Sequence, residues 1–313
     1  QLIHEYSAVK DNIKDFFETG WSQNHNVSLS GVSNDNKMTY YLSYSYTDDN
    51  GIMPYDKDVY SRNTLAMRNS YQANEWLKLS SSFNFARSAT DAVGQFQGTS
   101  VIDGLYESSR DVSLVDKKDL SSAFNTPEAY YTPYGITNPY WAIENNYNHT
   151  DAKQINGKIQ ADITPIKDLT LTYRFGFDYS DYDSKIGVPQ IALDDKLITN
   201  DYGYAPSNMN QSGYVRNRYR RMHEFNHDFM ANYKNKFIAD RLDLSATVGV
   251  NMNERAMTSM TGQTTDLTFN TGFWDLSNGS TKTTLSELQS KRSLVGLFGD
   301  NKKKKNDMLY LGL

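Results

Sequence analysis

The sequence predicts an all-β protein, an antiparallel β-barrel that crosses a membrane. Two observations lead to this fold class: apolar and polar residues alternate with a period of two, and the connections between alternating segments are short and long in turn. The period of two is that of a pleated strand, whose successive side chains point to opposite faces. The unequal connections are typical of outer-membrane barrels, which have short turns at one rim and long loops at the other.

The alternation predicts ten strands, taken here in chain order. Val27 and Leu29 lie on one face before a polar turn, and Leu42 and Tyr44 continue that face after it. The same pattern recurs along the chain, ending in a short segment that follows a lysine run. The expected strands lie near residues 21–31, 38–46, 60–71, 75–87, 152–163, 168–179, 223–234, 240–253, 291–299 and 307–313.

The clearest strand has the length that a membrane requires. From Leu169 to Tyr179 every second residue is apolar or aromatic, while Arg174 and Asp178 lie between them. Ten steps at about 3.3 Å give about 33 Å of strand, and a tilt of about 40° lowers its height to about 25 Å. This height matches the apolar band of an outer-membrane barrel.

The connections separate a membrane barrel from a soluble β-sandwich, which is the alternative. In a meander every second connection lies at the same end of the sheet, so the long loops would all emerge on one side. Structureless loops of this length are uncommon in compact soluble domains. The short connections lie at 32–37, 72–74, 164–168, 235–239 and 300–306, and the long ones at 47–59, 88–151, 180–222 and 254–290, the last three expected as long extracellular loops.

Composition excludes other classes of protein. The 313 residues include 32 Lys and Arg against 37 Asp and Glu, and a net charge of -5 gives no basic field for nucleic acid. The absence of cysteine excludes disulfides, Cys-ligated zinc, iron–sulfur clusters and thiol nucleophiles. No apolar run reaches the roughly 20 residues of a membrane-spanning helix. The chain opens at Gln1 without a signal-like leader, so we expect a processed product or a fragment.

Several motifs carry a resemblance to a known family. The first hairpin has TGWSQNHNVSLSG at 19–31, TYYLSYSY at 39–46 and DDNGI at 48–52, and shorter motifs are NPYW at 138–141, GLFGD at 296–300 and MLYL at 308–311. In this order the motifs resemble the SusC/RagA-like TonB-dependent outer-membrane transporters of Bacteroidetes. The resemblance runs from about Asp15 to the end of the chain.

The resemblance implies both a fold and a function. The fold would be a 22-stranded plugged barrel in the bacterial outer membrane, of which 1–313 supplies about ten strands of one domain. The function would be TonB-dependent, energy-coupled import of oligosaccharides or peptides, together with a SusD-like surface lipoprotein. No plug domain or TonB-contacting segment is recognised in the sequence, so we expect an interior part of a longer protein. A passive porin or structural outer-membrane barrel is the alternative, and neither reading requires a cofactor.

One segment departs from the family pattern. Four consecutive lysines occupy 302–305, where an alternating strand would continue. A lysine facing lipid costs roughly 2–4 kcal/mol at the bilayer midplane but little near the interface. We therefore expect a periplasmic turn here; a wrongly assigned or engineered stretch is the alternative.

A zinc hydrolase is a remote alternative, because His223-Glu224-Phe225-Asn226-His227 is an H-E-x-x-H motif. On a helix the two histidines would share one face and could bind zinc, with Glu224 as general base. On a strand they would lie about 13 Å apart, too far for imidazoles that bind zinc at about 2.0–2.1 Å. The segment would pair with the alternating run from Leu242, so we expect a strand, no metal and no catalytic residue.

Aromatic residues in the longest loop are the candidate binding residues. Their flat faces suit sugar rings or peptide side chains, and they could equally pack the loop or contact a partner protein. Asn138 and Pro139 are expected to form an extended turn that orients Tyr140 and Trp141. The candidates are Tyr130, Tyr131, Tyr134, Tyr140 and Trp141.

Overall fold

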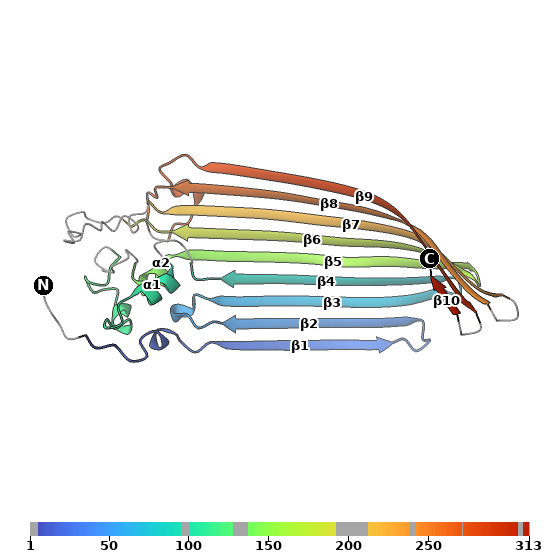
Figure 1. Cartoon of the computed structure of the whole chain (residues 1–313), viewed down its shortest axis with the longest axis horizontal. Helices are drawn as coiled ribbons and strands as arrows, with labels where there is room; N and C mark the ends of the chain where they lie inside the picture. Colours follow the sequence, from blue (N-terminus) through green and yellow to red (C-terminus); the bar gives the residue numbers. More distant parts are fainter. Residues whose placement is uncertain are drawn as a thin grey trace.

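The computed structural model describes residues 6–94, 100–127, 137–191, 212–237, 242–270, 272–305 and 309–312. They form one antiparallel sheet of ten strands, in which each strand pairs with the next along the chain (Figure 1). The strands are β1 (Trp21–Val32), β2 (Met38–Asn50), β3 (Val59–Asn74), β4 (Leu77–Asp91), β5 (Tyr147–Ile166), β6 (Leu169–Val188), β7 (Tyr214–Phe237), β8 (Leu242–Thr265), β9 (Thr284–Lys305) and β10 (Leu309–Gly312).

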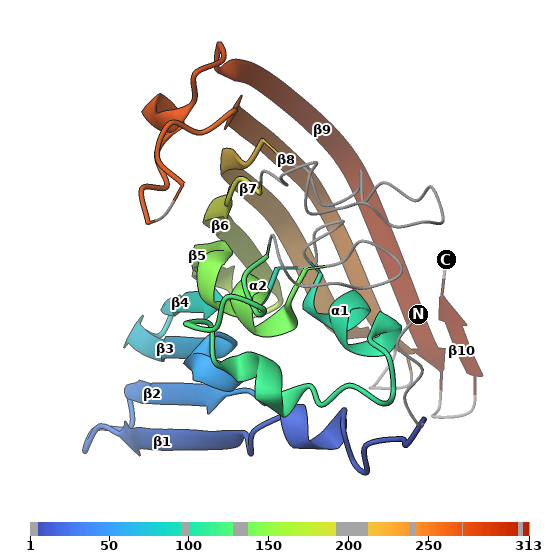
Figure 2. The same cartoon turned by 90° about the vertical axis from the view of Figure 1, so that its left-hand side faces the viewer.

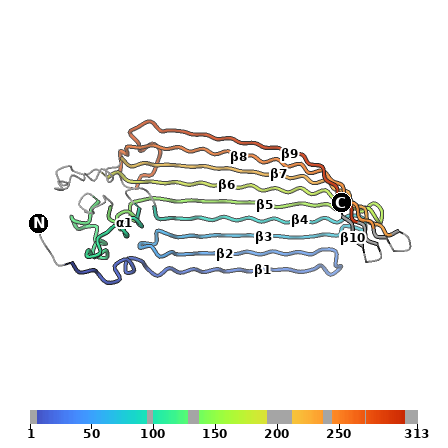
Figure 3. Tube along the Cα trace, viewed as in Figure 1, coloured from blue at the N-terminus to red at the C-terminus, as the bar shows by residue number. Residues whose placement is uncertain are grey.

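The sheet is a curved wall whose edges are β1 and β10. The long connections gather at one end of the strands and the short turns at the other (Figure 1, Figure 3). Viewed from the loop end, the wall bends around α1 (Val101–Glu107) and α2 (Pro139–Asn145) (Figure 2). Short 3-10 turns add η1 (Lys14–Phe16), η2 (Pro54–Asp56), η3 (Val115–Lys118) and η4 (Leu276–Asn278). No helix of the described residues is long and apolar enough to span a membrane.

The two faces of the wall differ in polarity. The strand register pairs apolar residues with apolar residues of the neighbouring strands on one face, and polar with polar on the other. Phe177 of β6 lies opposite Gly157 of β5 and Phe225 of β7, and this apolar face is called the outward face. Val248 and Leu297 on it are 62% and 82% exposed, which suits contact with lipid and not with water. The other face, called luminal, holds the polar residues that alternate with them, as in membrane barrels.

The outward face changes from apolar to charged within one lateral row, at the loop side of the strands. The last row of mainly apolar and aromatic side chains contains Ile155, Tyr179 and His223, and the next contains Lys153, Asp181 and Arg221. Arg221 Nε lies 3.5 Å from an Asp181 carboxylate oxygen, so the charged row is partly neutralised. The row change places the lipid boundary on the wall, because charged side chains are stable where water begins.

Most strands are longer than the alternation predicted. Each expected range overlaps a strand, but β7 begins at Tyr214 and β8 ends at Thr265, so the connections shorten to 189–213 and 266–283. The longest connection is 92–146 and contains both α-helices. Above the lipid boundary most side chains on both faces of a strand are polar, so the apolar half of the alternation is largely lost. The strands continue there through backbone pairing with their neighbours.

The lysine run lies in a strand, so the turn expected there is wrong. Lys302 to Lys305 pair in register with Ser245 to Leu242 of β8, and the run also pairs with β10. Neighbours on both sides satisfy the backbone hydrogen bonds, and the position near the turn end of the wall keeps the cost of lysine small. Lys302 is exposed, and its Nζ lies 3.5 Å from the Asp300 carboxylate. The connection to β10, at 306–308, lies outside the described residues.

A buried apolar cluster lies at the loop end, between segments outside the sheet. It forms where the segment before β1 packs with the longest loop. Val9 N donates to Arg110 O at 2.8 Å, and Asn12 bonds both to Val112 O and to Leu114 N, each at 2.8 Å. We call the cluster the loop core: Phe16, Val101, Leu105, Leu114, Tyr140, Ala142 and Ile143.

Candidate functional site

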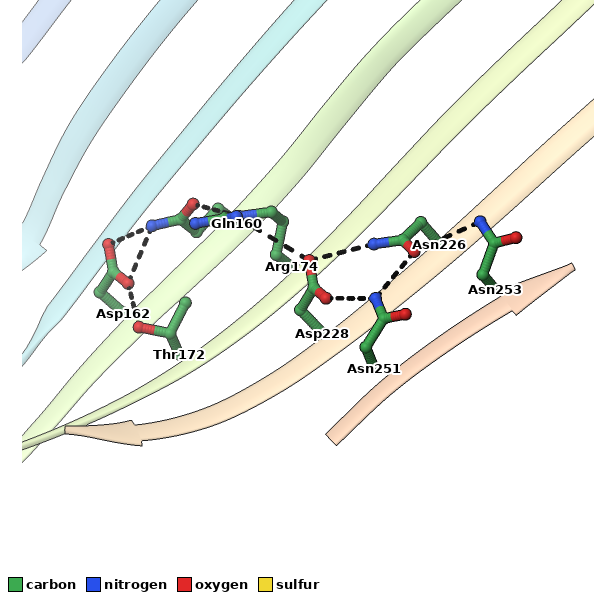
Figure 4. Close-up of polar contacts among 8 residues, drawn as sticks. All are labelled: Gln160, Asp162, Thr172, Arg174, Asn226, Asp228, Asn251 and Asn253. Atoms are coloured by element: carbon green, nitrogen blue, oxygen red, sulfur yellow. Dashed lines mark hydrogen bonds and ion pairs between the residues drawn. The ribbon is translucent and has the colours of Figure 1, made fainter. Parts of the chain in front are cut away.

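The luminal face carries a continuous polar network across four strands, and it is the candidate functional site (Figure 4). Arg174 of β6 lies near its centre. Its Nε donates to Gln160 Oε1 at 3.0 Å, and its guanidinium lies 3.8 Å from a carboxylate oxygen of Asp228. These contacts join β5, β6 and β7, because the three residues occupy one lateral row of the register.

The network ends toward β5 at a carboxylate. Asp162 accepts hydrogen bonds from Gln160 Nε2 at 3.0 Å and from Thr172 Oγ1 at 2.7 Å (Figure 4). The same glutamine accepts from Arg174 through its oxygen, so its amide links a cation to an anion. This stretch of the luminal face therefore presents paired charges and neutral amides instead of a field of one sign.

Toward β8 the network continues through asparagine amides that donate to carboxylates and to each other. Asn251 Nδ2 donates to Asp228 Oδ1 at 2.6 Å and to Asn226 Oδ1 at 2.8 Å. Asn253 Nδ2 donates to Glu224 Oε1 at 2.8 Å. Amides and carboxylates in alternation both donate and accept, so this surface can hydrogen-bond a polar solute or another polar protein surface.

An open depression of about 340 Å³ lies beside the network. Gly176 lacks a side chain at its floor, and the nearest neighbour of an added Cβ would be Asn226 at 3.7 Å. Lys158, Asp178 and Glu224 are among the lining residues. One cation and two carboxylates make the depression polar without strong preference for either sign of charge.

The H-E-x-x-H motif does not form a metal site, which contradicts the zinc alternative. His223 and His227 lie on the outward face of β7, opposite Tyr179 and Phe175, whereas Glu224 lies on the luminal face. The Nδ1 atom of His227 is 3.0 Å from the hydroxyl of Tyr173. Across the described part of the chain, no cluster of three His, Asp or Glu could hold a metal ion. The expected strand is confirmed. Because side chains alternate along a strand, Glu224 lies on the face opposite His223 and His227 and cannot act with them at one metal ion.

The aromatic candidates of the longest loop divide into three groups. Tyr130, Tyr131 and Tyr134 lie outside the described residues. Tyr140 is 2% exposed, its ring centroid lies 4.7 Å from that of Phe16, and burial raises its pKa to about 12. Tyr140 therefore packs in the loop core and offers no face to a ligand, contrary to the expectation.

Trp141, the remaining candidate, is partly exposed, and a binding role for its ring stays a prediction.

The NPYW motif begins a helix and not the extended turn that the sequence predicted. Asn138 is the N-cap of α2: its side-chain oxygen accepts from Tyr140 N at 3.0 Å. Pro139 follows at the first helical position, where its fixed φ favours the helix and no N–H is needed. Asn138 Nδ2 also donates to the carbonyls of Lys117 and Asn125, both at 2.9 Å. The motif therefore ties α2 to the rest of the loop.

Three luminal arginines were missed by the sequence analysis because 180–222 was expected to be a loop. Arg216, Arg218 and Arg220 belong to β7, two residues apart on the luminal face near the loop end. The signal that could have found them is the R-x-R-x-R spacing itself, which is that of a strand with one basic face. We call these three residues the arginine ladder.

No family model and no curated protein matches this sequence. Two similar solved structures are the RagAB peptide importer in an open-open state and the RagAB peptide transporter, with TM-scores of 0.74 and 0.72. Each is 21% identical over 96% and 97% of this chain, which spans 32% of either one. At this identity the likeness shows the fold: the wall is part of a barrel of the RagAB type. The predicted fold class is confirmed, and the predicted outer-membrane location agrees with it.

Proposed function

We propose that this chain forms part of the barrel of a TonB-dependent transporter that imports peptides across the bacterial outer membrane. The observation that carries the proposal is the wall itself, with its apolar outward face, its polar luminal face and its fold likeness to RagAB peptide importer chains. The charged row above Tyr179 sets the outer boundary of the membrane. Transport along the luminal face would use hydrogen bonding to solute and needs no catalytic group.

Peptides are the proposed substrate class, with oligosaccharides as the second candidate. The RagAB structures are of a peptide importer or transporter, which supports the first choice. The luminal amides of Asn226, Asn251 and Asn253 can donate to and accept from a peptide backbone, which presents both groups. Sugar hydroxyls can also both donate and accept, so the uptake experiment below compares oligosaccharides with peptides.

A SusD-like surface lipoprotein is the proposed partner at the loop end. The RagAB structures support a transporter that works as one member of a complex. Large apolar side chains at this end are open to solvent: Phe124 is 79%, Tyr106 71% and Phe269 63% exposed. Aromatic side chains are enriched at protein interfaces, where their burial supplies much of the affinity. The TonB complex would engage a segment outside 1–313.

The transport proposal is tested with the full-length protein in its native host. Cells lacking the gene should take up a fluorescent peptide mixture more slowly, and the full-length gene should restore uptake and fractionate with outer membranes. A proton ionophore or loss of TonB should abolish the restored uptake. Uptake that persists without TonB would instead establish a passive porin. Restored uptake of oligosaccharides but not of peptides would contradict the substrate class.

A further inference from the structure

The arginine ladder lies at the loop end of β7, on the luminal face. Alternation along β7 (Tyr214–Phe237) gives Arg216, Arg218 and Arg220 the same face as Glu224 and Asn226 of the polar network. The register is unbroken on both sides, so the three side chains emerge in line along the strand. They lie nearer the loop end of β7 than Glu224, which lines the depression.

The luminal neighbours of the ladder are neutral. On β6 and β8 the cross-strand partners carry hydroxyl, amide or apolar side chains, and the same holds one strand further on either side. In these described rows of β5 to β9 no carboxylate balances the three positive charges. The partners are Ile186, Ser184 and Tyr182 on β6, Gln263, Thr261 and Ser259 on β8, Asn148, Thr150 and Ala152 on β5, and Thr284, Ser286 and Leu288 on β9.

Three other arginines of the wall lie beside a carboxylate, unlike those of the ladder. Arg87 binds Asp151 at 2.7 Å, Arg174 lies 3.8 Å from Asp228, and Arg221 lies 3.5 Å from Asp181. Arg218 and Arg220 are exposed and form no ion pair with any described residue. Their charge is therefore available to a ligand, and an uncompensated cluster raises the local concentration of anions.

Contacts with aromatic rings hold two of the side chains against the wall. The guanidinium of Arg220 lies 5.2 Å from the ring centroid of Tyr182, and that of Arg216 lies 5.2 Å from the ring of Tyr214. Arg216 Nε also donates to Gln263 Oε1 at 2.8 Å. A guanidinium has five N–H donors, so these contacts leave others free to bind a carboxylate, with two parallel bonds in the best geometry.

We propose that the arginine ladder binds acidic peptides, and so selects anionic substrates at the mouth of the lumen. Successive residues of the ladder are two strand steps apart, about 6.6 Å. An extended peptide repeats its own side chains on one face with the same spacing, so Glu or Asp at every second position can meet successive arginines. This inference rests on the proposed function, because it names the charge of the peptide that the transporter would import.

The test compares two peptides of equal length on the full-length transporter with its lipoprotein partner, purified in detergent. One peptide carries Glu at alternate positions and the other carries Gln there. Wild-type protein should bind the Glu peptide about tenfold more tightly at low salt, as expected for two or three exposed charge contacts. The preference should shrink as ionic strength rises, because salt screens exposed charges.

Three variants locate the effect. Arg218→Gln with Arg220→Gln should remove the preference and leave affinity for the Gln peptide unchanged. Arg218→Lys with Arg220→Lys should keep part of the preference, since the charge remains but bidentate bonding is lost. Arg221→Gln is the matched control, because this neighbour lies on the outward face beside Asp181. It should bind both peptides as the wild type does.

The outcomes separate this inference from the proposed function. Equal affinity for the two peptides in the wild type, or a preference that survives the double Gln variant, would overturn the inference. Preferential binding without TonB-dependent uptake would overturn the transport proposal alone, whereas uptake of both peptides without preference would overturn the ladder alone. Binding of a uronic-acid oligosaccharide, but of neither peptide, would overturn the peptide assignment.

Discussion

Loss of the Asn138 side chain should loosen the loop end without disturbing the barrel wall. This residue is 0% exposed, caps α2 by accepting from Tyr140 N, and donates to the carbonyls of Lys117 and Asn125. Asn138→Ala removes all three hydrogen bonds. The cap is worth about 1 kcal/mol, and each of the two carbonyls left without its donor costs about 1 kcal/mol. The expected loss is therefore about 3 kcal/mol of local stability, or roughly a hundredfold more frequent opening.

Two further variants test how this loss of stability is divided between the helix cap and the two donated hydrogen bonds. Asn138→Ser keeps an oxygen for the cap and loses the two donations, so about 2 kcal/mol should be lost. Asn145→Ala is the matched control at the other end of α2, where a partly exposed amide donates once, to Trp141 O at 3.0 Å. That change should cost less than about 1 kcal/mol.

Hydrogen exchange of the full-length protein in detergent, read by mass spectrometry, measures these differences directly. Amides of 114–127 and 137–146 should exchange fastest in Asn138→Ala, less so in Asn138→Ser, and least in Asn145→Ala. Amides of β5 to β8 serve as the internal reference and should be unchanged, since their pairing does not involve the loop core. Unaltered exchange at 137–146 in Asn138→Ala, or an equal effect of Asn145→Ala, would refute the capping argument.

Three other predictions address the wall, the histidines and the loop surface. Phe175→Lys should impair barrel assembly by about 2–4 kcal/mol because it places a charge against lipid, while Asp178→Asn on the luminal face should be mild; equal heat stability of the two folded barrels would show that the faces are assigned wrongly. Purified protein should contain no stoichiometric zinc; one zinc per chain that is lost in His227→Ala would contradict this. Trp141→Ala should weaken lipoprotein co-purification or substrate affinity by about 0.5–1.5 kcal/mol for a lost ring contact, with assembly intact; unchanged values for both would identify the ring as packing.

The strand order and the faces of the wall could be predicted because the period of two is local. Leu169 to Tyr179 needs no distant residue to reveal its apolar row, and the register of β6 against β5 and β7 follows from matching such rows. The strand ends could not be predicted in this way. Beyond the row of Tyr179 most residues on both faces are polar, so the alternation is lost and the extensions of β7 and β8 were predicted as loop, with the arginine ladder inside them.

The loop end was decided by tertiary contacts between segments far apart in sequence. Tyr140 and Trp141 are adjacent aromatic residues, and the sequence does not distinguish them; the packing of Phe16 against the Tyr140 ring buries one and leaves the other partly exposed. Asn138 likewise acquires its role from carbonyls 13 and 21 residues away.

The sequence by itself determined the class of fold, the alternation of faces and the exclusion of helical membrane spans, because each depends on residue spacing within a single strand. Only the tertiary structure decided where the strands end, which loop aromatic is buried, and that Glu224 is separated from His223 and His227 by the sheet. The physical reason is that burial and charge compensation depend on which neighbours the sheet register and loop packing bring together. A local pattern fixes the face of a residue, whereas its partners come from other strands and loops.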